Sequence, residues 1–351
     1  WLYNPGTSSL TVSNVYRIGT GGLVYGSTDI AAGSYASVLT VNGAAYRFYS
    51  SGNPFYAYST TDSDVATTTD NQAWDWSFTL IPKPMLSPQV LVGLGIGRDP
   101  TSAVNTNENG NPIWITPVGN GASAVTVYID YNGDDKGAYT DPYGNKYDFS
   151  TNLLELQQAK IYDPDGDQTA MLIYVLQTNV TLAAAWGQDT TTATAGEPGL
   201  DVGTSIPPED VIDVTKNLAV TLDADGDGLL SPSDRAEYLI RVGNTARAPI
   251  PADVIVKDAL PEDTTYVVNS TYYRTSTNGT WTAVADNSSG TAFPLDDSGF
   301  RIAASIPVGG AFEVRFQVNV DAYADLTPGM KSIVNTGSVT TVMFNRTVTF
   351  Y

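Results

Sequence analysis

The amino-acid sequence predicts an all-β protein built from two β-sandwich-like domains. The prediction depends on three observations: short stretches in which apolar and polar residues alternate, turn-forming Gly, Pro, Asn and Asp between these stretches, and a high content of Thr, Ser, Tyr and Val. Alternation with a period of two puts apolar side chains on one face of a strand, and the turn-forming residues end the strand. At 351 residues the chain is long enough for two hydrophobic cores.

The first domain is expected to span residues 1–207. The stretch 152–161 is rich in helix formers and is the best candidate for a helical turn, although its apolar spacing is also compatible with a strand. The polar, Pro-containing stretch 187–208 predicts a linker or an extended strap to the second domain. Strands are expected at 9–16, 46–49, 55–58, 74–81, 90–97, 112–117, 124–129, 170–176 and 180–186.

The second domain is expected to span residues 208–351. Seven short strands at this spacing predict a two-sheet sandwich of the immunoglobulin type. The final stretch 339–351 is longer than a closing strand needs, so we expect it either to pack on the first domain or to pair with another subunit by β-augmentation. The seven strands are expected near 236–243, 252–258, 265–273, 281–285, 300–306, 311–320 and 333–344.

The acidic stretch that begins at Asp223 predicts a calcium-binding loop between the first strands of this second domain. Carboxylates occupy positions 1, 3, 5 and 12 of a twelve-residue loop, with a glycine at 6, a backbone carbonyl at 7 and a hydroxyl at 9. This is the spacing by which an EF-hand-type loop wraps one Ca²⁺ ion with oxygen ligands. Both flanks resemble strands rather than helices, so Ca²⁺ is expected to clip two strands together; the alternative is an acidic, glycine-rich surface turn. The expected ligands are Asp223, Asp225, Asp227, Leu229, Ser231 and Asp234.

A second acidic run precedes the strand expected at 170–176. Asp163, Asp165 and Asp167 alternate with Pro164 and Gly166, which resembles the opening of a calcium loop without its closing residue. A plain Asp-Gly turn explains the same pattern. The acidic turns within 130–148 are also compatible with a cation site or with solvated hairpin ends, because their spacing matches no defined loop.

Charge and composition exclude several classes of protein. The chain has 37 acidic and 17 basic residues, a formal charge of −20, which disfavours binding to nucleic acid and to anionic membranes and favours divalent cations. It has no Cys, hence no disulfides, and no His, hence no Ser-His-Asp triad and no usual zinc site. A two-carboxylate glycosidase is compatible with this composition, but no carboxylate pair stands out, so we expect no enzyme.

The expected location is extracellular or on a cell surface. No apolar run approaches the ~18 residues of a membrane span, and the chain begins at Trp1 without Met, which suggests a processed or excised piece. Aromatic residues offer a possible glycan-binding platform, while the alternative is that they fill half-buried sheet faces. The aromatic residues considered are Tyr46, Phe55, Tyr58, Trp74 and Trp76.

The second domain resembles the conserved-repeat domain of unknown function found in tandem on bacterial and archaeal surface proteins. The resemblance is carried by the stretches 222–234, 236–245, 256–261, 265–267 and 334–339, and it departs at Ala246, where that family usually has glycine. The first domain resembles the IgGFc-binding-like module of secreted bacterial proteins through 163–169 and 183–189. Both resemblances imply large, modular, exported surface proteins, and neither implies catalysis.

These observations together predict a non-catalytic extracellular structural or adhesive protein that Ca²⁺ stabilises. Its partners are expected to be further copies of itself or other surface proteins, with assembly into a filament or sheath through β-strand pairing. The alternative function is a carbohydrate-binding adhesin module that uses surface aromatic residues.

Overall fold

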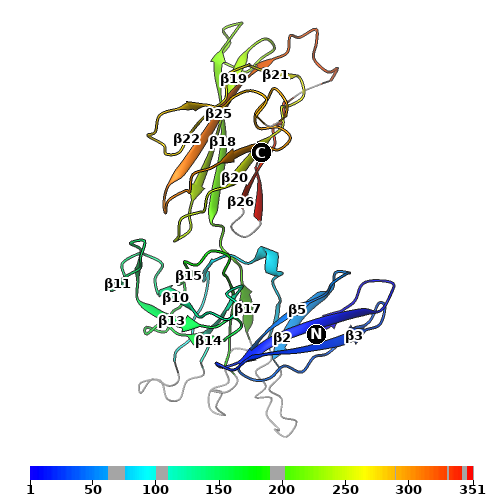
Figure 1. Ribbon diagram of the computed structural model, residues 1–351, viewed down its shortest axis with the longest axis vertical. Coiled ribbons are helices and arrows are strands. Elements are labelled where there is room, and N and C mark those ends of the chain that lie inside the picture. Colours follow the sequence, from blue (N-terminus) through cyan, green and yellow to red (C-terminus); the bar gives the residue numbers. More distant parts are fainter. Residues whose placement is uncertain are drawn as a thin grey trace. The chain divides into compact units, whose positions relative to one another are not determined.

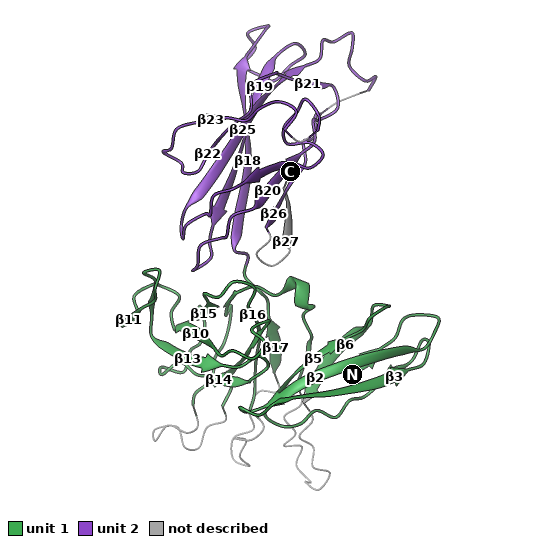
Figure 2. Ribbon diagram, viewed as in Figure 1, with its two compact units in different colours: residues 1–209 green, residues 210–351 purple. Residues whose placement is uncertain are grey.

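The computed structural model describes residues 1–61, 76–99, 110–189, 202–288, 290–329, 332–341 and 346–350. The chain divides into two compact units, Trp1–Glu209 and Asp210–Tyr351 (Figure 2). The predicted all-β fold is confirmed, since the one helical element among the described residues is a single 3₁₀ turn, η1, at Lys83–Met85. No described helix has the length and apolarity needed to cross a membrane.

Unit 1 begins with two small sheets. One sheet has the strand order β4-β1-β6-β7, all antiparallel. The other has the order β3-β2-β5, also antiparallel, and its three strands are labelled in Figure 1. Their core consists of Leu2, Leu10, Val12 and Ile30. The strands are β1 (Leu2–Tyr3), β2 (Leu10–Ile18), β3 (Leu23–Ile30), β4 (Tyr35–Ala36), β5 (Ala44–Tyr49), β6 (Tyr56–Thr61) and β7 (Trp76–Thr79).

A second pair of sheets completes unit 1. Their orders are β13-β10-β15-β8 and β14-β9-β16-β17, with a separate β11-β12 ribbon. Val127 and Ile173 from the first of these sheets share one core with Ile115 and Leu182 from the second. The strands are β8 (Gln89–Leu91), β9 (Ile113–Val118), β10 (Val125–Asp130), β11 (Tyr139–Thr140), β12 (Lys146–Tyr147), β13 (Phe149–Leu153), β14 (Ala159–Ile161), β15 (Leu172–Val175), β16 (Thr181–Gly187) and β17 (Gly203–Ile206).

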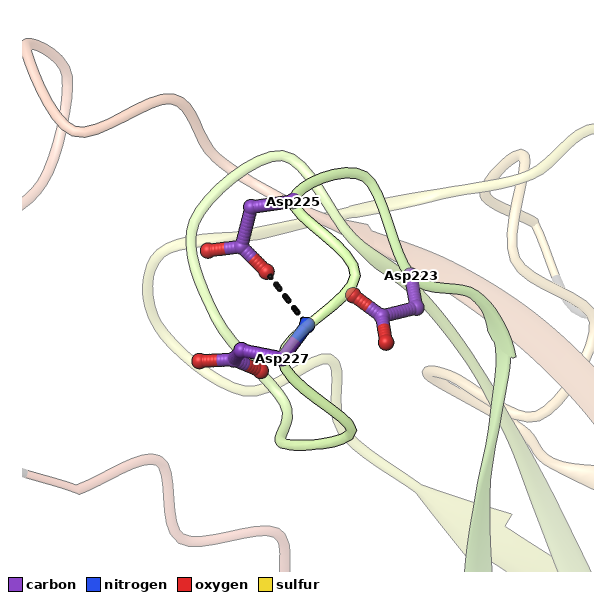
Figure 3. Close-up of side chains that lie close together, drawn as sticks. All are labelled: Asp223, Asp225 and Asp227. Carbon is purple, nitrogen blue, oxygen red and sulfur yellow. Dashed lines mark hydrogen bonds between the residues drawn. The ribbon is translucent and has the colours of Figure 1, made fainter.

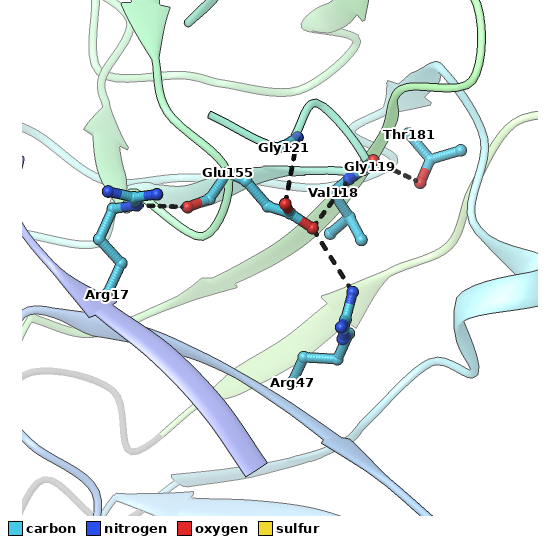
Figure 4. Close-up of polar contacts among 7 residues, drawn as sticks. All are labelled: Arg17, Arg47, Val118, Gly119, Gly121, Glu155 and Thr181. Atoms are coloured by element: carbon cyan, nitrogen blue, oxygen red, sulfur yellow. Dashed lines mark hydrogen bonds and ion pairs between the residues drawn. The ribbon is translucent and has the colours of Figure 1, made fainter. Parts of the chain in front are cut away.

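Two side chains tie these pairs of sheets together. Trp76 of β7 is buried, and its indole N–H donates to the Gln188 carbonyl over 3.0 Å. It packs so closely on Gly203 that an added Cβ there would lie 1.8 Å from the ring. The carboxylate of Glu155, between β13 and β14, lies 3.4 Å from the guanidinium of Arg47 on β5 (Figure 4).

In unit 1 the structure shows the strand alternative at one stretch and corrects the expectation for another. The helical turn expected at 152–161 is instead the end of β13, a turn with Leu156 at φ 60°, and β14. Burial of Leu153, Leu156 and Ile161 in a strand–turn–strand path outweighs the helix propensity of the intervening Glu and Gln. The stretch 187–208 is not entirely a linker, because β17 pairs with β16 inside the sheet; residues 190–201 lie outside the described part of the chain.

Unit 2 is a sandwich of two antiparallel sheets. One sheet has the order β18-β19-β25-β22-β23, with β21 also paired to β25, and the other has β24-β20-β26-β27. Ile240 and Phe316 from the first sheet share the core with Val256 and Val339 from the second. The strands are β18 (Ile212–Leu222), β19 (Arg235–Asn244), β20 (Val254–Asp258), β21 (Thr264–Tyr266), β22 (Tyr272–Arg274), β23 (Thr282–Ala283), β24 (Phe300–Ile302), β25 (Ala311–Val320), β26 (Gly337–Thr341) and β27 (Arg346–Phe350).

The end of the chain differs from the expectation of a surplus strand. Residues 346–350 form β27, which pairs antiparallel with β26 of the same unit, with Val339 opposite Val348. The chain therefore reverses within 339–351 and extends its own sheet, instead of continuing as one strand toward the first domain or another subunit. Alternation alone did not reveal the reversal because the stretch contains no Gly or Pro.

Candidate calcium-binding loop

The acidic loop 223–234 connects β18 and β19, which form a long antiparallel pair in unit 2. β18 and β19 pair from Ile212 opposite Asn244 to Leu222 opposite Arg235, with a register shift near the loop. Gly226 and Gly228 adopt φ of 76° and 78°, the left-handed region that glycine enters without steric cost. The two glycines let the chain coil tightly, so that alternate side chains face a common centre.

Three carboxylates of this loop form a group. One oxygen from each of Asp223, Asp225 and Asp227 lies within 4.8 Å of the other two (Figure 3). Among the described residues, this is the one place where three such groups approach closely enough to share an ion. Like charges at this separation repel one another, and a bound divalent cation converts the repulsion into attraction.

Backbone N–H groups hold the first carboxylate in place. Asp223 accepts the N–H of Gly226 over 2.7 Å and that of Gly228 over 2.8 Å. Both hydrogen bonds stabilise the charged form and so lower the pKa of Asp223. The bond from Gly228 has the larger effect, and that from Gly226 the smaller. The carboxylate of Asp227 accepts the N–H of Leu229 over 2.7 Å. Asp223 is therefore ionised and oriented before any ligand arrives.

Asp234 joins the start of the loop to its end. Its carboxyl is fully buried and accepts the N–H groups of Ala224 and Ser231, each over 2.7 Å. These hydrogen bonds lower the pKa of Asp234, and the one from Ala224 has the larger effect. The carboxylate of Asp234 lies outside the group of three, so its oxygens fasten the start of the loop to its end.

The remaining expected ligands lie in the same loop. The Ser231 hydroxyl donates to the Asp225 carboxylate over 3.3 Å, which places an oxygen next to the group of three. The side chain of Leu229 is exposed, and this residue contributes to the prediction only through its backbone carbonyl. The sequence thus identified the loop, while the hydrogen bonds that order it come from backbone groups that spacing does not show.

The run at 163–167 has a different arrangement. Asp165 donates its N–H to the Asp163 carboxylate over 3.1 Å, and Asp167 donates its N–H to the Asp165 carboxylate over 2.9 Å. Each carboxylate thus serves the backbone two residues later, as in Asx turns, and the three are not brought together around one centre. Asp163 is buried, and burial raises its pKa to about 6. A calcium site here stays a prediction.

The aromatic residues that the sequence offered as a glycan platform are mostly not on the surface. Trp76 is buried, Tyr46 stacks on Tyr16 with ring centroids 4.4 Å apart, and Trp74 lies outside the described residues. Phe55 is half-buried against the core of the first pair of sheets, and Tyr58 is 45% exposed.

A different row of aromatic residues is exposed in unit 1. In the register of β4, β1 and β6, Tyr3 lies opposite both Tyr35 and Tyr56, so the three rings share one face. Their exposures are 40%, 71% and 68%, and Tyr3 stacks on Tyr56 with centroids 6.3 Å apart. Sequence reasoning missed this row because β1 and β4 are only two residues long.

Comparison with known proteins gives no family for the chain. No protein-family model matches it, and no curated protein matches it in sequence, so neither resemblance described above is confirmed.

Similarity to solved structures is low. The T6 backbone pilin of serotype M6 Streptococcus pyogenes is 12% identical with a TM-score of 0.28, over 66% of this chain and 58% of the pilin chain. The chain thus spans less than two thirds of that pilin. The serine-rich repeat protein Srr2 of Streptococcus agalactiae is 12% identical, with a TM-score of 0.22 over 76% of this chain and 92% of that one. A putative membrane-anchored protein of Corynebacterium diphtheriae is 10% identical, with a TM-score of 0.20 over 97% and 94%. TM-scores this low carry no argument about function.

Proposed function

We propose that this protein is a non-catalytic structural or adhesive component of a cell surface, and that Ca²⁺ bound in the β18–β19 loop stabilises unit 2. The observation that carries the proposal is the group formed by Asp223, Asp225 and Asp227. Ca²⁺ takes six to eight oxygen ligands in flexible geometry. The loop supplies the three carboxylates, the Ser231 hydroxyl and the Leu229 carbonyl, and water completes the shell.

The ion has a mechanical role in this proposal. β18 and β19 are joined only by the loop at this end, and the loop carries three carboxylates whose mutual repulsion favours opening. Ca²⁺ neutralises this repulsion and fixes the end of the hairpin. The charge of −20 suits a protein that works in a medium containing free Ca²⁺. The absence of His and Cys supports a non-catalytic role.

The calcium proposal is tested with Asp225→Ala together with Asp227→Ala. The wild-type protein should bind Ca²⁺ in isothermal titration, and its unit 2 should melt at a higher temperature in Ca²⁺ than in chelator. The double variant should lose both effects, and it should melt at or above the temperature of the wild type in chelator, because two of the repelling carboxylates are gone. Asp325→Ala, which removes an exposed carboxylate of unit 2 outside the loop, is the matched control. If the wild type melted at the same temperature in Ca²⁺ and in chelator, the calcium proposal would be ruled out.

Self-assembly by strand pairing is the second part of the proposal. The support comes from β18, the edge strand of its sheet, whose last six residues are all exposed. Leu218, Val220 and Leu222 on its second half are 44%, 36% and 50% exposed. An exposed apolar edge strand is a template for pairing with another chain. We therefore place the assembling edge on β18 rather than at the end of the chain.

Electron microscopy tests this assembly. We expect ordered filaments in Ca²⁺ that fray on chelation, and monodisperse particles for Leu218→Lys with Val220→Lys, because charges on an edge strand oppose pairing. Thr282→Lys on β23, another edge strand of the same sheet, should leave the filaments intact. Monodisperse wild-type particles in both conditions would rule out self-assembly.

The exposed row of Tyr35, Tyr3 and Tyr56 favours one alternative function, carbohydrate binding. Aromatic faces in a row match the apolar faces of successive sugar rings. Binding on a glycan array that is lost on Tyr3→Ala with Tyr56→Ala, and kept on Tyr143→Ala elsewhere on the surface of unit 1, would support it. No binding by the wild type to any glycan would exclude it.

A further inference from the structure

The core of unit 2 contains a buried group of three polar side chains. The Lys216 ammonium nitrogen lies 2.7 Å from an Asp258 carboxylate oxygen, and the two side chains are 3% and 0% exposed. Asn335 is 8% exposed, and its side chain lies next to that of Asp258. Buried charged and amide side chains in an apolar core are costly unless they are fully paired, so their presence requires an explanation.

The strands bring these residues together from both sheets. Lys216 is on β18, in the first sheet, at an inward position of the alternation that begins with Ile212 and Val214. Asp258 ends β20 and Asn335 precedes β26, both in the second sheet, where Asp258 pairs with Gly337. The Lys216 side chain therefore crosses the core from one sheet to the other.

Aromatic residues enclose the group. The Lys216 nitrogen lies 4.9 Å from the centroid of the Tyr238 ring, which in turn stacks on Phe316 with centroids 5.3 Å apart. This low-dielectric surrounding disfavours charge on both members of the pair. Burial lowers the pKa of Lys216, and burial raises the pKa of Asp258 to about 6, against the opposing effects of the Lys216 charge and the Asn335 side chain. A shift of the proton from the amine to the carboxylate is therefore easier here than in water.

Asn335 is the third member, and pairing does not explain its burial. Its carboxamide lies close enough to lower the pKa of both Asp258 and Tyr238 against the raising effect of burial. Nevertheless, neither its oxygen nor its nitrogen makes a hydrogen bond of good geometry within the described part of the chain. The carboxamide thus sits next to a carboxyl group that also contacts a desolvated amine.

We propose that Lys216 and Asn335 form an intramolecular isopeptide bond, with Asp258 as the group that transfers the protons. The neutral amine of Lys216 attacks the side-chain carbonyl carbon of Asn335, while the Asp258 carboxyl donates its proton to the carbonyl oxygen. The resulting carboxylate takes a proton from the attacking nitrogen and delivers it to the amide nitrogen. The bond from carbon to that nitrogen then breaks, ammonia leaves, and the oxygen returns its proton to the Asp258 carboxylate as the carbonyl forms again. An amine and a primary amide become a secondary amide and ammonia, with no oxidation or reduction.

The bond would change the mechanics of unit 2 independently of Ca²⁺. It would join the first strand of the unit to the segment that precedes β26, and so would fasten one sheet to the other across the core. The chain between Lys216 and Asn335 contains most of the strands of the unit, so the cross-link would restrict the unfolded state as a disulfide does. This inference goes beyond the proposed function, because it depends on a different site and on no ligand.

Mass spectrometry of the full chain under denaturing conditions tests the bond. The intact mass should be lower than the sequence mass by one ammonia, and a protease digest should yield a branched peptide that joins Lys216 to Asn335. Succinimide formation at an Asn-Gly pair, such as Asn278-Gly279, also releases ammonia, and the branched peptide distinguishes the two. An intact mass equal to the sequence mass, or a loss of water with Lys216 joined to Asp258, would overturn the proposal.

Three variants separate the reaction from the fold. Asp258→Asn keeps the size of the side chain and both reacting groups, and it should restore the full sequence mass because no group remains to transfer the protons. Asn335→Ala should also restore it, whereas Lys257→Ala, on an exposed neighbour, should keep the deficit. The uncross-linked variants should migrate more slowly than the wild type in denaturing gels, since the wild type stays looped. If Asp258→Asn still lacked the mass of one ammonia, the role of Asp258 would be overturned. The mass is measured under denaturing conditions, so this outcome can be read whether or not the variant folds.

Discussion

Glu155 connects the two pairs of sheets in unit 1 through one side chain that is 12% exposed. Its carboxylate accepts two backbone N–H groups, at 3.2 and 3.1 Å, and lies 3.4 Å from the Arg47 guanidinium. Its own backbone carbonyl accepts the Nε–H of the buried Arg17 over 2.6 Å. The loop that carries Glu155 is thus fixed on both sides by hydrogen bonds (Figure 4), in addition to the burial of its neighbour Leu156 in a cluster with Val15 and Val118.

Glu155→Gln should lower the free energy of unfolding of unit 1 by about 1 kcal/mol, because an amide N–H₂ replaces one carboxylate oxygen, so one part-buried backbone N–H loses its acceptor and Arg47 loses its charged partner. Chemical denaturation of wild type and variant measures the difference. Asp134→Asn, which breaks the exposed ion pair with Lys136, should have no measurable effect. Equal losses in the two variants would contradict the buried role of Glu155.

Asp163 gives unit 1 a measurable dependence on pH. Burial raises its pKa to about 6 from an ordinary value of 3.8, so the folded state holds the proton more tightly than the unfolded state. The stabilising effect of this proton is complete below pH 3.8 and is lost as the pH rises through about 6. Asp163→Asn should therefore stabilise unit 1 by about 1–3 kcal/mol at neutral pH and leave it unchanged in acid.

The two proteins are compared by denaturation at neutral pH and in acid. Chelator is present throughout, so that no metal bound at 163–167 contributes to the measured stability. A variant that is less stable than the wild type at neutral pH in chelator would contradict the penalty assigned to Asp163. A variant that is less stable only in Ca²⁺ would instead favour the second calcium site.

At the same scale, the buried group in unit 2 shows what sequence reasoning could have found. Lys216 and Asp258 take core-facing positions of β18 and β20, two residues from Val214 and Val256, and Asn335 lies two residues before β26, in step with the inward-facing Val339. Polar residues at three such positions were a visible signal. Their proximity was not visible, because it depends on which strands face each other across the core, and spacing along the chain carries no information on that.

At the scale of elements, the β18–β19 hairpin could be predicted and the end of the chain could not. Alternation on both sides of the loop and the carboxylate spacing identified the hairpin and its connection. The reversal between β26 and β27 occurs in a run of β-branched and aromatic residues without turn-forming Gly or Pro, so it reads as one strand.

The hydrogen bonds that Asp234 accepts lead to a prediction about this hairpin that does not depend on metal binding. Asp234→Ala should lower the Tm of unit 2 by several degrees even in chelator, because the N–H groups of Ala224 and Ser231 lose their acceptor. Asp225→Ala in chelator should not lower the Tm, since Asp225 accepts mainly from exposed groups and its removal relieves repulsion within the loop. Thermal unfolding followed by circular dichroism distinguishes the two. Equal effects of the two substitutions would show that Asp234 is no more than a further loop carboxylate.

At the scale of the whole molecule, each unit has hydrogen bonds that reach the division between Glu209 and Asp210. The Glu209 N–H donates to the Gln89 carbonyl over 3.2 Å inside unit 1. The Thr245 hydroxyl donates to the Asp210 carbonyl over 2.9 Å inside unit 2. Because each core is made only of residues from its own unit, we expect the two units to unfold as separate cooperative transitions.

Calorimetry of the full chain should therefore show two transitions, of which Ca²⁺ raises only one. At a free Ca²⁺ concentration one hundred times the Kd, binding to the folded state alone adds about 2.7 kcal/mol, which corresponds to about 10 °C for a domain of this size. Residues 210–351 produced alone should give the calcium-sensitive transition at the same temperature, and residues 1–209 the insensitive one. If Ca²⁺ raised both transitions equally, the ion would have to bind outside the β18–β19 loop as well, and Asp163 with its neighbours in unit 1 would be the first place to look for it.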